Sequence, residues 1–227
     1  RAFDSDNWPI TAGELGRQYT AYGDGQGFKP FVYKKIGLGF ARVVGPADHF
    51  EGINVRAPSG ENEGMGPHGI KASGLLMVDG VLYLWGRNAG NARLAWSTDH
   101  AQSWTWADWR FATGFGYPTF LNFGPNYRSA RDAWVYVYSH DADSAYDPAD
   151  RMVLARVPQD RIRDRDAYEF FVRRGDAGVP VWSADIADRG AVFEYPGLCR
   201  RSGITYDAGL DRYLWWQQRG EEDVDTR

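Results

Sequence analysis

A tyrosine-containing strand pattern that occurs four times constrains the fold of this chain more than any other feature. The four copies occupy residues 19–22, 83–85, 136–138 and 213–216, at intervals of 53 to 77 residues. Another run with strand character precedes each copy, at residues 8–11, 73–78, 118–123 and 202–206. Further strand-like runs follow the first three copies, at residues 40–42, 94–96, 104–109, 154–156 and 168–172. Units of about four strands, repeated along a chain, are typical of a β-propeller.

We therefore predict an all-β fold, a single β-propeller domain over residues 1–227, and the alternative is a β-sandwich without a true repeat. The fourth copy reaches the end of the sequence before its outer strands, so we expect about four blades with a truncation at the C-terminus. An open propeller would leave strand edges unpaired, which favours a chain that belongs to a longer propeller. Residues 159–167 are the one segment expected to contain a helical turn or two.

Composition excludes several classes of protein. Lys plus Arg number 26 and Asp plus Glu number 30, and this balance of charges argues against a nucleic-acid-binding protein. Cys199 is the single cysteine, so the sequence offers no disulfide framework or cysteine zinc site, and we expect a buried structural thiol. No apolar run is long enough to predict a membrane span, and the N-terminus does not resemble a signal peptide.

Polar residues gather where the strands of each predicted hairpin begin and end. In a propeller blade, the start of the first strand and the end of the second lie at the same face, so these residues should line one mouth of the central channel. Aromatic side chains there could stack on sugar rings, and charged and amide groups could bind hydroxyls. The predicted substrate-binding residues are Asn7, Trp8, Lys71, Arg87, Asn88, Tyr117, His140, Asp141, Arg201 and Gln217. The expected partner is a polysaccharide or an oligosaccharide.

Two carboxylates at this mouth, Asp6 and Asp24, come from adjacent strands of the first blade. Hydrolysis of a glycosidic bond needs one carboxylic acid to protonate the leaving oxygen and a second carboxylate to attack the sugar or activate water. The sequence therefore predicts Asp6 and Asp24 as a catalytic pair, with Asp141 and Asp143 as other candidates. Asp24, which lies in Tyr-Gly-Asp-Gly, also suits a tight turn.

Two further motifs carry a structural interpretation. Residues 97–104 are close to the Asp-box of sialidase-like propellers, with Ala101 in place of the glycine. This motif indicates a hairpin between outer strands rather than a catalytic site. Asp141, Asp143 and Asp147 alternate as the oxygen ligands of calcium loops do. A structural calcium ion and a solvated acidic loop are both open there, and we expect no other cofactor or metal.

Residues 6–11, 19–25, 39–42 and 151–156 resemble a bacterial propeller family long catalogued only as a domain of unknown function. Some members of that family are endo-D-arabinanases, five-bladed glycoside hydrolases that cleave mycobacterial arabinan. The resemblance covers most of the chain. It implies that Asp6 and Asp24 are the acid and the base of an inverting hydrolysis, without indicating which is which.

Three functions remain open from the sequence. The first is a glycoside hydrolase acting on a polysaccharide, with an arabinan as one candidate, and the second is a non-catalytic glycan-binding propeller. The third is a polysaccharide lyase, in which His140 or Tyr117 would be the base and Lys71, Arg87 and Arg201 would neutralise a uronate. A polymeric substrate favours an extracellular or periplasmic location.

Overall fold

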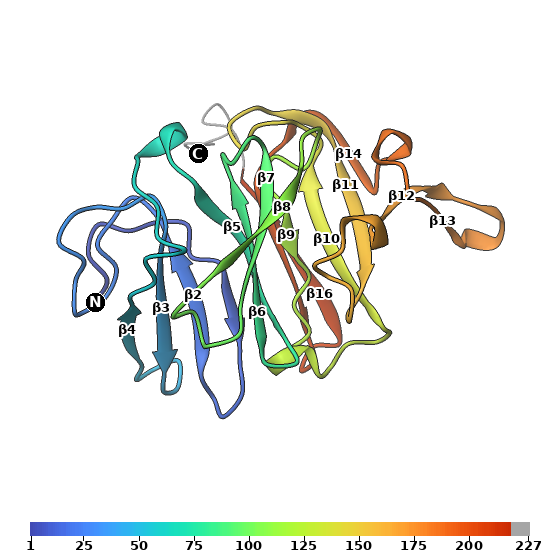
Figure 1. The fold of residues 1–227 in the computed structure, drawn as a ribbon. Coiled ribbons are helices and arrows are strands. Elements are labelled where there is room, and N and C mark those ends of the chain that lie inside the picture. Colours follow the sequence, from blue (N-terminus) through green and yellow to red (C-terminus); the bar gives the residue numbers. More distant parts are fainter. Residues whose placement is uncertain (219–227) are drawn as a thin grey trace, which may run out of the picture.

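The computed structural model describes residues 1–218 and shows an all-β chain in which four antiparallel sheets follow one another in sequence (Figure 1). The first sheet has the order β1 (Ile10–Ala12), β2 (Gln18–Tyr22), β3 (Gly39–Val44) and β4 (Glu51–Val55). The second has the order β5 (Lys71–Val78), β6 (Val81–Arg87), β7 (Ala92–Ser97) and β8 (Thr105–Phe111). The third contains β9 (Thr119–Phe120), β10 (Trp134–His140), β11 (Ala149–Pro158), β12 (Glu169–Arg174) and β13 (Pro180–Ser183). β14 (Phe193–Cys199) pairs with β11, and β15 (Ser202–Asp207) forms a hairpin with β16 (Arg212–Gln217).

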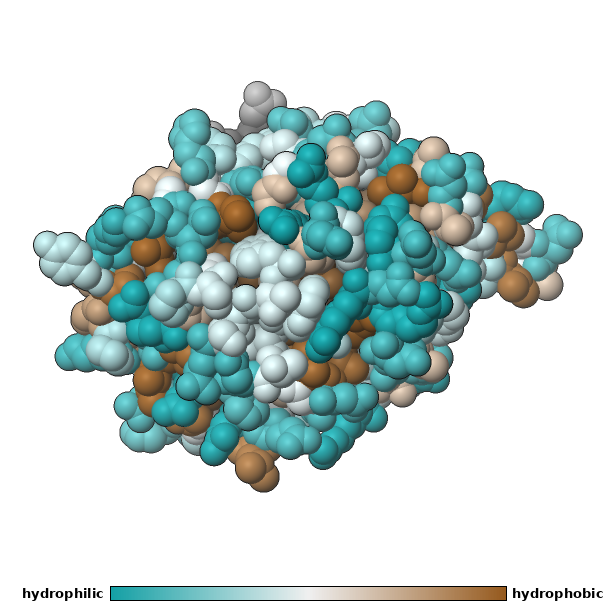
Figure 2. All heavy atoms as spheres, viewed as in Figure 1, coloured by the Kyte–Doolittle hydropathy of each residue, from teal (hydrophilic) through white to brown (hydrophobic). Residues whose placement is uncertain are grey.

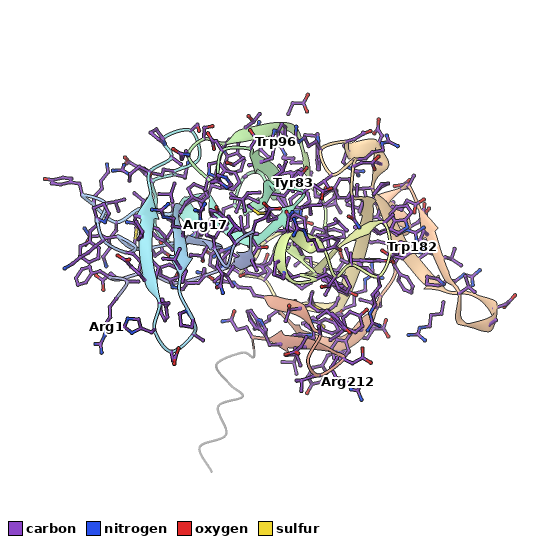
Figure 3. All side chains as sticks on the ribbon, turned by 90° about the horizontal axis from the view of Figure 1, so that it is seen from below. Arg1, Arg17, Tyr83, Trp96, Trp182 and Arg212 are labelled. Carbon is purple, nitrogen blue, oxygen red and sulfur yellow. The ribbon has the colours of Figure 1, made fainter. Side chains whose placement is uncertain are left out.

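The first strand of each sheet lies nearest the centre of the molecule. β1 contacts β5, β5 contacts β9 and β9 contacts β15, so the inner strands surround a central channel of about 790 Å³. Viewed from below, the sheets are set around this centre (Figure 3). Together these features confirm the predicted all-β propeller, whereas the number of blades in a complete propeller stays a prediction.

Short hairpin turns join β1 to β2, β5 to β6 and β15 to β16 at the lower side of the molecule in Figure 1, and a longer connection, residues 121–133, joins β9 to β10. Asp79 and Gly80 connect β5 to β6, and both have positive φ, 47° and 78°. This backbone matches a two-residue type I′ turn, whose twist suits antiparallel strands. Because the turns lie at the lower side, the starts of β5 and β15 and the ends of β6 and β16 meet at the upper side.

The largest core lies between the second and third sheets. Trp85, Phe111, Tyr168 and Phe170 are at most 1% exposed, and their ring centroids lie 5.0 to 6.2 Å apart where they contact. All eight residues of β5 are buried because neighbouring sheets cover both of its faces. Outside this core, polar residues cover most of the side seen in Figure 2, with smaller apolar areas between them.

Sequence patterns predicted where many of the strands lie more accurately than where each strand begins and ends. The predicted strands at 8–11 and 118–123 are shorter in the structure, as β1 and β9, while β4, β13 and β14 were not predicted. β14 includes Pro196 and Gly197, which favour a loop when no partner strand is known.

The expected helical segment at 159–167 forms only the 3-10 turn Arg165–Ala167. Further 3-10 turns occupy Gly66–His68, Pro125–Tyr127, Asp176–Gly178 and Ile186–Asp188. Within residues 1–218, no helix is long and apolar enough to cross a membrane.

The Asp-box has the predicted hairpin geometry between β7 and β8. The Asp99 carboxylate accepts hydrogen bonds from the Ser103 amide at 2.9 Å and from the Ser97 hydroxyl at 2.8 Å. Trp104 is buried and stacks on Phe40 of the first sheet, with 4.6 Å between ring centroids. The motif therefore closes a turn and connects two neighbouring blades.

Candidate functional site

The predicted mouth residues lie at or next to the strand ends opposite the hairpin turns, and these strand ends are at the upper side in Figure 1. Strand register produces this arrangement, because Lys71 at the start of β5 pairs with Arg87 at the end of β6. In the fourth hairpin, Gln217 pairs with Ser202, directly after Arg201. In the first sheet, Asp6 and Gly23 exchange backbone hydrogen bonds of 3.0 and 2.9 Å.

Asp6, Asp24 and Lys71 form one cluster at this mouth. The ammonium of Lys71 forms a short ion pair with Asp24, and the Lys71 side chain is only 1% exposed while that of Asp24 is 21% exposed. Asp6 Oδ1 and Lys71 Nζ lie 3.5 and 3.8 Å from the point where a Cβ on Gly23 would stand. Asn7 donates a 2.6 Å hydrogen bond to Asp6 Oδ1. Asp6 thus pairs with Gly23, the residue directly before Asp24, and the buried ammonium of Lys71 lies beside both positions.

The backbone around the cluster is tightly constrained. A Cβ on Gly25 would lie 1.6 Å from the carbonyl oxygen of Asp4, so only glycine fits this close approach. Asn7, Asp24 and Asn88 all have left-handed φ, at 51°, 52° and 63°. Asn and Asp tolerate this conformation better than other non-glycine residues, and strained backbone of this kind concentrates at functional sites.

The segment before β5, which contains Gly66, forms a hydrogen bond with Asp24. The Gly66 amide donates a 3.3 Å hydrogen bond to Asp24 Oδ1. Asn88 in turn donates to the carbonyl oxygen of Gly69 at 3.0 Å. Asn88 therefore binds the same loop whose Gly66 amide contacts Asp24, and sequence reasoning did not identify this amide as part of the site.

A second cluster, which we call the arginine–tyrosine cluster, contains Arg87, Arg201, Tyr117 and Tyr146. The Arg87 guanidinium lies 5.5 Å from the centroid of the Tyr117 ring and 5.4 Å from that of Tyr146. The Arg201 guanidinium lies 5.9 and 4.6 Å from the same two centroids. Arg87 also donates a 3.0 Å hydrogen bond to the Tyr146 hydroxyl. Two cations thus share two aromatic rings.

Burial and charge shift the pKa values of this cluster. Burial raises the pKa of Tyr117 above its usual 10, against the opposing effect of Arg87 and Arg201. Burial lowers the pKa of Arg201, and the positive charge of Arg87 lowers it further. For Tyr146, burial opposes ionisation, but the hydrogen bond and charge of Arg87 outweigh it and lower the pKa. The negative charge of Asp6 is among the causes of the shifts of both Tyr117 and Arg201.

Several predicted binding residues also have partners within the protein. Asp141 binds Arg151 and Arg189, each at 2.7 Å, and its side chain is 7% exposed. The buried His140 places Nε2 2.9 Å from the carbonyl oxygen of Ser144. Trp8 packs against Tyr22 and Phe28 and also lines the central channel.

The acidic loop at residues 141–147, considered above as a calcium loop or a solvated loop, contains Tyr146, which the sequence analysis did not single out. Asp143 accepts a 2.6 Å hydrogen bond from the Gly114 amide, and Asp141 binds the two arginines. In residues 1–218, no group of three or more His, Cys, Asp or Glu side chains could hold a metal ion. Tyr146 lies in this loop, and its signal in the sequence is its position between the acidic residues. Cys199 is buried, as expected.

Comparison with known proteins gives the fold but no family. No protein-family model matches the chain, and neither does any curated protein sequence. A "putative hydrolase" from Bacteroides ovatus superposes with a TM-score of 0.55 at 11% identity, over 96% of this chain and 65% of that one. The GH43_1 enzyme from Xanthomonas citri complexed with xylose gives a TM-score of 0.48 at 14% identity, over 94% and 66%. The endosialidase of phage phi92 gives 0.45 at 12% identity, over 90% and 29%.

The chain thus spans less than two thirds of each of these structures. The likeness to the Bacteroides ovatus structure, with its TM-score of 0.55 at 11% identity, shows a shared fold and nothing about activity. What the site does has to be argued from its own residues.

Proposed function

We propose that the protein is a glycoside hydrolase that cleaves a polysaccharide or oligosaccharide at the upper mouth of the propeller. One observation carries the proposal: Asp6 pairs with Gly23, the residue directly before Asp24, and the buried Lys71 forms an ion pair with Asp24. Two carboxylates at a channel mouth are the groups that hydrolysis of a glycosidic bond requires. The adjacent aromatic rings of Tyr117 and Tyr146 would contact a sugar.

The ion pair suggests a division of roles. Protonation of Asp24 would leave the buried ammonium of Lys71 without its counter-ion, so Asp24 suits the role of an ionised carboxylate. Asp6 would then donate its proton to the leaving glycosidic oxygen. In an inverting reaction, Asp24 removes a proton from water, and the water oxygen bonds to the anomeric carbon as the carbon–oxygen bond to the leaving group breaks.

The sugar and the location belong to the same proposal. The resemblance in the first blade favours an arabinan among neutral polymers. A polymeric substrate favours an extracellular or periplasmic enzyme.

Release of new reducing ends tests the proposal. The panel includes D-arabinan, L-arabinan and uronate polymers, incubated with the wild-type protein and with Asp6→Asn and Asp24→Asn. Asp160→Asn is the matched control, because Asp160 is exposed and lies in a turn away from the mouth. We expect each mouth variant to lose at least about a hundredfold in turnover, with the control unchanged. Full activity in both mouth variants would refute the catalytic pair, and saturable binding without new ends would support a glycan-binding propeller.

One observation favours a lyase as the second candidate. Tyr146 has a lowered pKa and lies beside Arg87 and Arg201, an arrangement that suits a base next to a neutralised uronate. The bases considered from the sequence suit this role less, since burial raises the pKa of Tyr117 and His140 contacts Ser144. A lyase would create an unsaturated uronate with ultraviolet absorbance, which a hydrolase does not produce.

A further inference from the structure

Lys71 and Arg87 are the two buried lysine or arginine side chains in residues 1–218, and only one of them has a counter-ion there. They are cross-strand partners at the ends of β5 and β6. Lys71 is neutralised by Asp24, whereas Arg87, 1% exposed, has no carboxylate within 4 Å among the described residues. Arg87 Nε is also buried without a hydrogen-bond partner in this part of the chain. A buried cation left without a counter-charge is costly.

Arg201 makes this arrangement less favourable. Its guanidinium lies over the same two tyrosine rings as that of Arg87, and it likewise forms no ion pair within residues 1–218. Its Nε donates to the carbonyl oxygen of Ala145 at 2.9 Å. Aromatic faces offset part of the cost of two neighbouring cations. They supply no negative charge.

The same region of the protein shows how an arginine pair is normally balanced. Arg151 and Arg189 both bind the carboxylate of Asp141, so two guanidinium groups share one anion. Arg87 and Arg201 are likewise two neighbouring guanidinium groups, but no carboxylate of the described residues lies between them. Asp6, the carboxylate whose charge reaches Arg201, lies beyond 4 Å from it.

We propose that Arg87 and Arg201 together bind an anionic group on the substrate, so that the site takes an acidic glycan. A carboxylate fits best, because two planar guanidinium forks match its oxygen atoms, and a sulfate or phosphate ester offers the same chemistry. Tyr146, 37% exposed, would contact the ring that carries this group, and the buried Tyr117 forms the base of the subsite. The inference rests on the proposed function, because Arg87 is the cross-strand partner of Lys71, which pairs with Asp24, and a sugar held by the subsite would be positioned at the catalytic pair.

Binding, measured by calorimetry without turnover, tests the subsite. The probes are trigalacturonate, its fully methyl-esterified form and a sulfated oligosaccharide of similar length. We expect the wild-type protein to bind trigalacturonate at least about tenfold more tightly than the ester, and to lose this preference at high salt. Arg-dependent binding of the sulfated probe would support the same anion site with an ester as the source.

Variants separate charge recognition from folding. Arg201→Gln, at a half-buried position, should abolish the preference, while Arg201→Lys should retain part of it. Arg87→Gln should act in the same way, with circular dichroism as a check that this buried position still folds. Arg161→Gln is the control, since Arg161 is exposed and pairs with Asp164 far along the chain from the site. Equal binding of acid and ester, or an unchanged preference in Arg201→Gln, would overturn the subsite.

The outcomes distinguish this inference from the proposed function. Selective binding of the acidic probe with no cleavage of any polymer would refute the hydrolase and leave the anion site standing. Cleavage of a neutral arabinan that depends on Asp6 and Asp24, without a preference for anions, would refute the anion site alone.

Discussion

At Ala101 the backbone has a φ of 70°, in the left-handed region that favours glycine. This is the Asp-box position where sialidase-like propellers carry glycine, and left-handed backbone costs an alanine about 1–2 kcal/mol. Ala101→Gly should therefore raise the free energy of unfolding by about 0.5–1 kcal/mol, after the entropic cost of glycine. A thermal melt should show a rise of a few degrees. Ala95→Gly, in the middle of β7, is the control and should lower stability.

The Lys71–Asp24 pair gives a second prediction at the residue scale. Asp24→Asn leaves a buried ammonium without its carboxylate and should cost about 3 kcal/mol in urea unfolding. The double variant Asp24→Asn/Lys71→Met removes both charges and should recover most of that loss. Neither protein should turn over substrate. If the double variant were no more stable than the single one, the stabilising role of the pair would be wrong.

At the scale of elements, the loop from β10 to β11 is coupled to the charge of His140. Burial and the nearby Arg201 lower the pKa of this histidine below its usual 6.5, although Ser144, Asp141 and Asp147 act in the opposite direction. Below pH 6.5 the unfolded chain therefore binds a proton that the folded chain does not. Stability should be complete above pH 6.5 and should fall as the pH drops from 6.5 toward the folded pKa.

Melting temperatures between pH 7.5 and 5 check this expectation. His140→Gln keeps a polar side chain at the same position without an imidazole, and it should flatten the acid slope. His49→Gln is the control because His49 is exposed. An equal slope in wild type and His140→Gln would show that other groups dominate.

The sequence alone predicted a strand only where that strand carries its own residue pattern. The Tyr-centred strands β2, β6, β10 and β16 were found because aromatic and β-branched residues are concentrated there. β4 and β14 were missed, since Glu51-Gly52 and Pro196-Gly197 carry no such pattern and become strands only by pairing with β3 and β11.

The same limit applies to the candidate site. Hairpin geometry placed Asp6, Asp24, Lys71 and Arg87 at one mouth, because strand ends meet by topology. It gave no information on side-chain partners, so it did not predict that two arginines bind Asp141, a residue that stays a predicted sugar ligand. Tyr146 was not predicted as a site residue, because its contacts are with Arg87 and Arg201, which are distant in the sequence.

At the scale of the whole molecule, the described chain presents an uncovered strand. Within residues 1–218, β16 pairs only with β15, and Tyr213, Leu214 and Trp216 on it are 49%, 44% and 58% exposed. Free strand edges pair with other edges, and exposed apolar side chains strengthen such contacts. The 227-residue protein should therefore associate as its concentration rises, and light scattering coupled to size exclusion should show masses above 25.6 kDa.

Charge at this edge should reverse the association. Lysine is a residue that natural edge strands use against pairing, so Leu214→Lys combined with Trp216→Lys should keep the mass at that of one chain. Leu15→Lys supplies the control: Leu15 is 88% exposed, but it lies in the turn between β1 and β2. Association that persists in the β16 double variant would place the contact elsewhere. Loss of association in both proteins would point to net charge rather than to the strand edge.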